Sequence, residues 1–284
     1  MPGDARAAAR AAVETAEAYY DSHDADRFYA IIWGGEDIHV GLYDSDDEPI
    51  AQASRKTVVH MATKLAGLKP GARVLDLGAG YGGAARHLAR EHGAHVTCLN
   101  LSEVENARNR SLTSEQGLSD QIRVDHGAFE ELSYPDASFD IVWSQDAFLH
   151  SADRARVLTG AARVLKPGGE IIFTDPMQAD TIADPAALKP VYERIHLPNL
   201  GSFAFYREQL DALGLEDAGT QDLSGQLRTH YARVRAELTA RRGELKGAVS
   251  DAYVARMLDG LAHWVSAADQ GQLAWGVIHY RKPG

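Results

Sequence analysis

The chain has 284 residues, which is enough for one large α/β domain with an added cap and too few to require a second core. Acidic residues outnumber basic ones by 40 to 29, giving a net charge of -11, and no basic run is interleaved with aromatic residues, so we expect no nucleic-acid partner. The only cysteine, Cys98, excludes an internal disulfide, and no apolar run could cross a bilayer, so we expect a cytoplasmic protein with no membrane partner.

The first predicted elements are helical. An alanine-rich stretch with interspersed charges predicts a helix over residues 5–20, and a second helix is expected over residues 50–68. Between them, residues 28–33 and a loop at residues 34–43 are aromatic and glycine-rich without clean periodicity, and a loop this apolar is expected to pack against the rest of the protein. A Lys-Pro-Gly turn at residues 69–71 then leads into the first strand.

Strands and helices alternate through the middle of the chain. Strands are expected at residues 73–77, 95–99, 121–125, 139–143 and 169–174, and helices at 82–92, 103–116 and 153–164. We predict a tight turn at residues 166–169, between the last of these helices and the strand that follows it. This βαβ repetition predicts a parallel sheet.

The last third of the chain departs from this alternation. Four prolines within residues 176–201 predict irregular turns and one short helix near 186–195, which we interpret as a cap over the carboxyl edge of the sheet. A helix at 204–213, a strand near 214–222, helices at 226–245 and 250–266 and a final strand at 273–280 follow.

A glycine motif follows the first strand. Glycines 78, 80 and 83 fit the spacing G-x-G-x-x-G, which lets the backbone approach a ligand closely at a helix N-terminus. Asp76 adds a carboxylate that would repel a pyrophosphate and attract the ammonium of a methionine moiety. The motif therefore resembles the first motif of class I S-adenosylmethionine-dependent methyltransferases, with Asp76, Gly78 and Gly80 as cofactor-binding residues; a glycine turn without ligand is the alternative.

The ends of the next two strands predict further cofactor contacts. Asn100 stands where an acid commonly binds the ribose hydroxyls, and its amide can accept a hydrogen bond from one hydroxyl and donate to the other. Ala128 stands where the family often has an acid for the adenine amino group, so we expect adenine to contact the backbone of Ala128 and the ring of Phe129. Strand-end, helix-cap or core roles are the alternatives for Asn100 and Phe129. Leu101 and Gln145 complete the predicted cofactor set.

Asp146 and His150 are the candidate catalytic residues. They leave the fourth strand at its carboxyl end, where open α/β sheets bind ligands. If the segment is helical, a spacing of four places both side chains on one side, where they could orient or deprotonate a methyl acceptor. A helix cap and a packed surface histidine are the alternatives. The same Asp and His spacing occurs in phosphoethanolamine methyltransferases.

Longer strings narrow the resemblance. FYAIIWGGEDIH (residues 28–39), WSQDAFLH (143–150) and FTDPMQAD (173–180) resemble the sarcosine/dimethylglycine N-methyltransferases of glycine betaine synthesis, and the likeness extends to the ending WGVIHYRK (275–282). The resemblance implies methyl transfer from S-adenosylmethionine to sarcosine and N,N-dimethylglycine, giving glycine betaine as an osmolyte, without a metal.

The same resemblance implies an α/β fold with a Rossmann-like methyltransferase sheet of seven strands, mostly parallel with the last strand antiparallel. Residues 1–68 would form a helical lid, 69–175 the cofactor-binding core, 176–203 an inserted cap, and 204–284 the rest of the sheet with a helical insertion.

The acceptor site is predicted from the chemistry of the product. A quaternary ammonium is well held by aromatic faces, and Tyr19, Tyr20, Trp33 and Tyr206, with Tyr43 and Phe148, are candidate walls; ordinary packing is the alternative. Pro176 and Met177 match positions that the family uses near the acceptor, and Arg194, or else Arg207, would bind the acceptor carboxylate. Rival functions are a methyltransferase for a phosphobase, oxygen or carbon, a noncatalytic S-adenosylmethionine-binding module, and a nicotinamide-dependent oxidoreductase, which Asp76 and Asn100 disfavour. The sequence leaves open whether the protein is a monomer or a homodimer.

Overall fold

The computed structural model describes residues 21, 23–182, 184–194 and 199–284. The helix predicted over residues 5–20 lies outside this part of the chain, as do Tyr19 and Tyr20. Within the described residues, no helix combines the length and the apolar character that a bilayer crossing requires.

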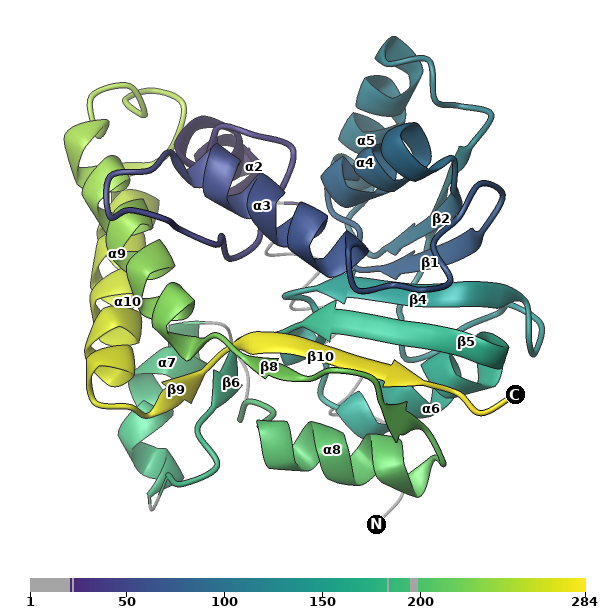
Figure 1. The fold of residues 1–284 in the computed structure, drawn as a ribbon. Helices are drawn as coiled ribbons and strands as arrows, with labels where there is room; N and C mark the ends of the chain where they lie inside the picture. The colour runs from purple at the N-terminus through teal and green to yellow at the C-terminus, as the bar shows by residue number, and fades with distance from the viewer. Residues whose placement is uncertain (1–20, 22, 183, 195–198) are drawn as a thin grey trace.

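A mostly parallel sheet forms the centre of the molecule (Figure 1). Its strands are β1 (Arg73–Leu77), β2 (His95–Asn100), β3 (Ile122–His126), β4 (Phe139–Gln145), β5 (Leu165–Thr174), β7 (Glu216–Asp217), β8 (Gln221–Asp222) and β10 (Gly276–Arg281). The order is β3-β2-β1-β4-β5-β10-β7, and β8 also pairs with β10. The strands β1 to β5 are parallel, whereas β10 runs antiparallel to β5. The predicted Rossmann-like sheet is therefore confirmed; β7 and β8 both lie beside β10, so they occupy the seventh strand position together.

Helices cover both faces of this sheet. In Figure 1, α3 (Ile50–Ala62), α4 (Gly83–His92) and α5 (Glu103–Glu115) lie above it, and α6 (Arg154–Val164) and α8 (Phe203–Ala212) lie below it. Alternate residues of the strands serve the two faces. Val74 and Ile141 belong to the apolar cluster that contains α4, while Leu75 and Val142 belong to the one that contains α6. The strands are apolar on both faces because both faces are covered.

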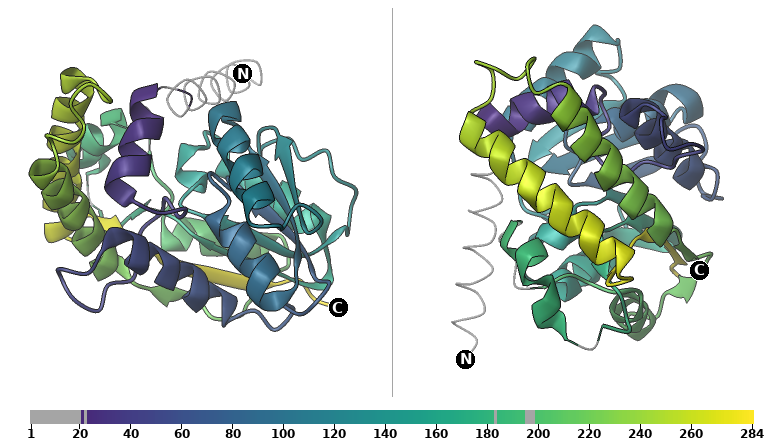
Figure 2. Two further views of the ribbon diagram at one scale, coloured as in Figure 1. Left: turned by 90° about the horizontal axis from the view of Figure 1, so that it is seen from above. Right: turned by 90° about the vertical axis from the view of Figure 1, so that its left-hand side faces the viewer.

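A helical cap packs beside the sheet as a third apolar cluster. It joins α2 (His23–Phe28), the π-helix η1 (Tyr29–Trp33), the short helices η3 (Pro185–Leu188) and α7 (Lys189–Arg194), and the long pair α9 (Ser224–Ala240) and α10 (Asp251–Asp269). Figure 2 shows α9 and α10 side by side at the edge of the molecule. A two-stranded ribbon of β6 (Met177–Gln178) and β9 (Leu273–Ala274) lies between this cap and the main sheet.

Several predicted boundaries were wrong. Residues 28–33, for which the sequence pattern predicted no element, form the end of α2 and a π-helix, and their apolar side chains pack within the cap cluster. The helix expected over residues 50–68 ends at Ala62, and the strand expected near 214–222 is reduced to β7 and β8. The turn expected at residues 166–169 is a bulge within β5, since Leu165 pairs with Phe139 and the next paired residue is Glu170.

Candidate active site

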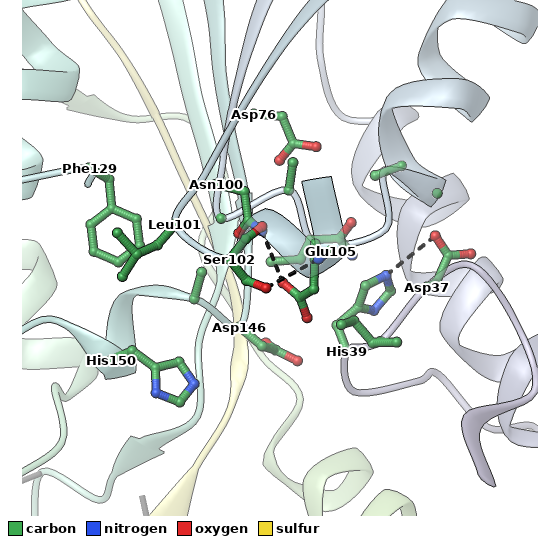
Figure 3. A pocket seen from close by; sticks show the side chains of 18 of the residues that line it. Asp37, His39, Asp76, Asn100, Leu101, Ser102, Glu105, Phe129, Asp146 and His150 are labelled. Carbon is green, nitrogen blue, oxygen red and sulfur yellow. Dashed lines mark hydrogen bonds and ion pairs between the residues drawn. The ribbon is translucent and has the colours of Figure 1, made fainter. Parts of the chain in front are cut away.

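A cavity opens at the carboxyl ends of β1, β2 and β4 (Figure 3). This position is the topological switch point of the sheet, because the chain continues from β1 to β2 on one side and β4 lies on the other. The lining residues are Glu36, Asp37, Ile38, His39, Asp76, Gly78, Ala79, Gly80, Gly83, Ala84, Asn100, Leu101, Ser102, Glu105, Ala128, Phe129, Glu130, Gln145, Asp146, Ala147 and His150. All the predicted cofactor-binding and catalytic residues are among them.

The glycine loop after β1 allows a close approach between two strand ends. Gly78 has a φ of 75°, and a Cβ at this position would lie 2.4 Å from the Cβ of Ala147. The Gly78 N–H donates to the Leu99 carbonyl of β2 at 2.8 Å. A larger residue would therefore both strain the backbone and separate the β1 and β4 ends of the cavity.

Asp76 is a buried acid at the end of the first strand, beside the glycine loop. Its side chain is 3% exposed, and its Oδ2 makes no hydrogen bond among the described residues. Burial raises its pKa to about 7, with the charge of Asp37 adding to the effect and that of His39 opposing it. A cationic ligand at this point of the cavity would stabilise the ionised carboxylate, which fits the ammonium of a methionine moiety.

The end of β2 differs from the sequence-based expectation. The Asn100 Nδ2 donates to Glu105 Oε2 at 2.9 Å, so this nitrogen is already engaged within the protein. Glu105 lies in the first turn of α5, beside the N-cap Ser102, whose Oγ accepts from the Glu105 N–H at 3.1 Å. The adjoining wall is apolar, with Phe129 packed edge-on against Phe148 at a centroid distance of 5.8 Å.

Asp146 does not begin an α-helix. It has a φ of 51°, and the chain continues into the 3-10 helix η2 (Phe148–His150), so the condition of a helix through both residues is not met, although Asp146 and His150 both line the cavity. Asp146 Oδ2 accepts from the Val40 N–H at 2.6 Å, and its Oδ1 accepts from Trp275 Nε1 at 2.8 Å. Burial raises the pKa of this carboxyl. Asp146 therefore fastens the segment around residue 40 and the final strand to the end of β4.

That segment contributes residues that sequence reasoning missed. Asp37 pairs with Arg55 at 2.9 Å, and His39 Nε2 lies 3.9 Å from Asp37 Oδ1. Burial alone would lower the pKa of His39, but the nearby carboxylate of Asp37 and the charge of Asp146 raise it. Ser54 donates to the His39 carbonyl at 2.8 Å and holds the segment against α3. The only signal in the sequence was a polar Glu-Asp-x-His string inside an otherwise apolar stretch.

Comparison with known proteins shows which family the chain belongs to. The sequence profile described as "Methyltransferase domain" matches residues 75–173. Over 271 residues, the chain is 55% identical to the sarcosine/dimethylglycine N-methyltransferase of Halorhodospira halochloris, covering 95% of this chain and 97% of that protein. The chain belongs to the sarcosine/dimethylglycine N-methyltransferase family. A protein of the same name from Aphanothece halophytica is 49% identical, covering 97% of this chain and 99% of that one. A crystal structure provisionally named as a sarcosine dimethylglycine methyltransferase from Galdieria sulphuraria superposes with a TM-score of 0.88 and 44% identity, covering 93% of this chain and 99% of that one.

The described rings of the predicted aromatic wall, Trp33, Tyr43, Phe148 and Tyr206, do not line the cavity of this N-methyltransferase. Trp33 packs against Tyr29 at 4.9 Å and against His230 at 5.3 Å within the cap cluster. Tyr206 is fully buried and donates its hydroxyl to Asp175 Oδ2 at 2.6 Å. These rings fill apolar cores, and among the described lining residues Phe129 is the one with a phenyl, phenol or indole ring.

The remaining predicted acceptor residues of the N-methyltransferase are also placed elsewhere. Pro176 is buried before β6, and Met177 lies in that strand with no exposed surface, paired with Ala274. Neither lines the cavity. Arg194 ends α7, but its side chain is outside the described part of the structure, as are Tyr19 and Tyr20 altogether. Substrate binding by these three residues stays a prediction.

The described wall is strongly acidic. Glu36, Asp37, Asp76, Glu105, Glu130 and Asp146 line the cavity, and His39 and His150 are the described lining residues that can carry positive charge. A site of this charge favours cationic ligands such as a sulfonium or an ammonium by Coulomb attraction rather than through an aromatic cage. The histidines are the charged donors that this wall offers to a carboxylate.

Proposed function

We propose that this protein is an S-adenosylmethionine-dependent N-methyltransferase that converts sarcosine and N,N-dimethylglycine to glycine betaine. The likeness to enzymes named for this reaction over nearly the whole of both chains carries the proposal for the acceptor. The buried Asp76 beside the glycine loop, with its free Oδ2 among the described residues, supports it for the methyl donor.

The residues of the first two strand ends fit the donor. Asp76 would hold the methionyl ammonium, and Gly78 and Gly80 would leave room for the ligand beside the backbone. Leu101, Ala128 and Phe129 would enclose the adenine through apolar contact. When bound, S-adenosylmethionine supplies a methyl group on a sulfonium centre, from which the amine nitrogen displaces the thioether.

Asp146 and His150 would lie beside the acceptor. An aliphatic amine is largely protonated at neutral pH and must lose its proton before its lone pair can form the new N–C bond. Both oxygens of Asp146 already accept hydrogen bonds, so we assign proton removal to His150. Asp146 would then stabilise the positive charge that the nitrogen gains. Holding the two reactants together would supply most of the rate enhancement.

The finer parts of the proposal concern metal, location and domain roles. We propose that the reaction needs no metal, that the enzyme works in the cytoplasm to make an osmolyte, and that residues 1–68 and 176–203 act as lid and cap over the core of residues 69–175. The contribution of both parts to one cap cluster supports the last point. A methylation rate that stays the same after a metal chelator is added would support the proposal that no metal is needed, and a loss of rate would contradict it.

The test is to incubate the enzyme with S-adenosylmethionine and, in turn, glycine, sarcosine, dimethylglycine and phosphoethanolamine, and to follow the products by mass. We expect dimethylglycine and betaine from sarcosine, and betaine from dimethylglycine. Product from phosphoethanolamine alone would favour the phosphobase alternative, and cofactor binding without any product would favour a noncatalytic module. Replacing Asp146 and His150 together should abolish turnover; unchanged turnover would contradict their roles.

A further inference from the structure

The turn that carries His150 has weak support of its own. Within η2, the His150 N–H donates to the Ala147 carbonyl at 3.1 Å and the Ser151 N–H to the Phe148 carbonyl at 3.0 Å. A single 3-10 turn has poorer hydrogen-bond geometry than an α-helix. Asp146, at its entry, has the left-handed φ of 51°, which is uncommon for a residue with a side chain and is held by its surroundings. The placement of His150 at the cavity (Figure 3) therefore depends on contacts from outside the turn.

Asp175 supplies one of these contacts from the end of β5. Its side chain is fully buried, and its Oδ1 accepts from the Leu149 N–H at 2.9 Å. Its Oδ2 accepts from the Tyr206 hydroxyl of α8 at 2.6 Å. Leu149 directly precedes His150, so the first of these bonds holds the backbone of η2 against the sheet. Asp175 does not line the cavity, and both of its oxygens face donors of the protein.

Arg154 holds the other side of the same residue. One terminal nitrogen of its guanidinium donates to the Leu149 carbonyl at 2.8 Å and to the Asn199 carbonyl at 2.9 Å. The other donates to Asn199 Oδ1 at 2.8 Å. Arg154 is the first residue of α6 and is buried. The N–H and the C=O of Leu149 are thus both bound by buried charged side chains, and Asn199 joins the segment of residues 176–203 to the same network.

Apolar packing does not explain an acid at this position. Burial raises the pKa of Asp175 to about 7, and the charge of Asp146 adds to this effect. The hydrogen bond from Tyr206, the charge of Arg154 and the hydrogen bond from the Leu149 N–H oppose it. A leucine of similar size would avoid the desolvation and suit the apolar cluster to which Tyr206 belongs. The hydrogen bonds that the carboxylate accepts are therefore the reason for its presence.

We propose that Asp175 is a positioning residue for His150, which it holds in place, together with Arg154, by fixing both peptide groups of Leu149. Neither side chain touches the reactants. A displacement of about 1 Å at a catalytic group can lower a rate by about 100-fold, so this clamp of Asp175, Arg154 and the Leu149 peptide groups acts on kcat rather than on donor binding. The inference rests on the proposed role of His150 in proton removal.

The experiment compares kcat with dimethylglycine and the KM for S-adenosylmethionine in the wild type, Asp175→Leu and Asp175→Asn. We expect Asp175→Leu to lower kcat about 10- to 100-fold and to leave the KM for the donor within about twofold, because no residue on the donor side changes. Asp175→Asn should keep kcat within about threefold, since its amide oxygen can accept from the Leu149 N–H while its NH2 donates to the Tyr206 hydroxyl oxygen. The midpoint of the pH dependence of kcat should be the same in the wild type and in Asp175→Asn.

Glu170→Gln is the matched control. Glu170 is a buried acid within β5, away from the cavity, and its Oε2 accepts from the Gly67 N–H at 2.6 Å. This variant should lose stability in urea unfolding but keep the kcat and the pH midpoint of the wild type. If Glu170→Gln and Asp175→Leu lower kcat equally, or if Asp175→Leu keeps its kcat, the inference is overturned. An equal loss in Asp175→Asn and Asp175→Leu, with a shifted midpoint, would overturn it in favour of a purely electrostatic role.

A second variant serves if Asp175→Leu does not fold. Arg154→Lys keeps the charge but lacks the planar fork that reaches Leu149 and Asn199 together. It should lower kcat in the same way, again with the KM for the donor within about twofold. An unchanged kcat in Arg154→Lys would contradict the clamp.

Amide hydrogen exchange tests the clamp without any substrate. Exchange at the Leu149 amide should be at least about 10-fold faster in Asp175→Leu than in the wild type. The Asp146 amide, which donates to the Thr174 carbonyl at 2.9 Å, reports general opening of the strand ends and should change less. Equal changes at both amides would contradict the clamp. An enzyme that protects Leu149 as expected but makes no betaine would refute the acceptor assignment and leave the clamp intact.

Discussion

Replacing Asp76 with Asn should make the ligand-free protein more stable at alkaline pH and should lower its affinity for the methyl donor. Burial raises the pKa of Asp76 from 3.8 to about 7, so the folded protein holds a proton that the unfolded chain releases between these values. The wild type therefore loses stability as the pH rises from the unfolded value to about 7. A difference of about three pKa units corresponds to about 4 kcal/mol at alkaline pH.

The Asp76→Asn variant would lack this titration but would itself bury an amide, so we expect a net gain of about 1–3 kcal/mol at about pH 8 and almost none near about pH 4. Urea unfolding of both proteins across this range measures the difference. Binding of S-adenosylhomocysteine should fall by about 10-fold or more in the same variant, because the carboxylate that pairs with the ammonium is gone.

Asp140→Asn is the control with the opposite sign. Asp140 lies on the neighbouring strand β4 and pairs with Lys166 at 2.7 Å. Burial opposes ionisation, but the hydrogen bonds from Lys166 and from the Arg73 N–H lower the pKa of Asp140. Its variant should lose stability above the acidic range rather than gain it. Parallel pH profiles for the wild type and Asp76→Asn would refute the reasoning about the buried carboxylate.

Three further substitutions test the geometry of the site and its support. Gly78→Ala should cost about 1–3 kcal/mol more than Gly71→Ala in urea unfolding, because both positions have positive φ but only the first meets a neighbouring Cβ at 2.4 Å; equal losses would show that backbone strain alone matters. Asp146→Asn should lower the free energy of unfolding by about 1–3 kcal/mol and kcat at least about 10-fold, because one of the two N–H groups that donate to Asp146 would face an amide NH2. Asp153→Asn is the control, since Asn substitutes well at this N-cap and should leave stability and kcat unchanged. An Asp146→Asn variant with unchanged stability and kcat would contradict the anchoring role of Asp146. Tyr206→Phe should destabilise the protein by about 1–3 kcal/mol through loss of its buried hydrogen bond while the KM for dimethylglycine stays within about twofold; a raised KM with unchanged stability would restore the substrate-binding prediction.

The sheet and the donor side of the site could be predicted because their signals are local. The period of apolar residues located β1 to β5 to within a few residues, and the strand-end positions of Asp76, Asn100 and Gln145 placed them together at one edge. Parallel strands with alternating crossovers bring their carboxyl ends to the same side whatever the loops do. The order of strands and helices along the chain was therefore sufficient to predict where the cavity lies and which strand-end residues line its donor side.

The rest of the site depends on contacts between distant segments. Val40 meets Asp146, and Asp37 meets Arg55, through pairings that no periodicity encodes. The positive φ of Asp146, which excludes an α-helix beginning at this residue, could not be read from its spacing to His150. Glu105 could have been weighed from its place two residues beyond Glu103 in the first turn, but only the structure shows which of the two faces the cavity.

The described rings of the predicted aromatic wall lie away from the cavity for a related reason. Rings such as Trp33 and Tyr206 look alike in sequence whether they line a ligand site or fill a core. The helical cap needs large apolar side chains to pack α9 and α10 against α2, and the sheet needs them beneath α8. Trp33 and Tyr206 therefore pack in apolar cores, and the described wall of the cavity is acidic rather than aromatic.

The measurement that tests the central claim most directly is a proton NMR time course of purified enzyme with S-adenosylmethionine carrying a carbon-13 methyl group and unlabelled dimethylglycine. We predict that labelled betaine and S-adenosylhomocysteine appear in equal amounts, with the label in one of the three N-methyl groups. Formation of S-adenosylhomocysteine without betaine, or no reaction by an enzyme shown to bind the donor, would contradict the account.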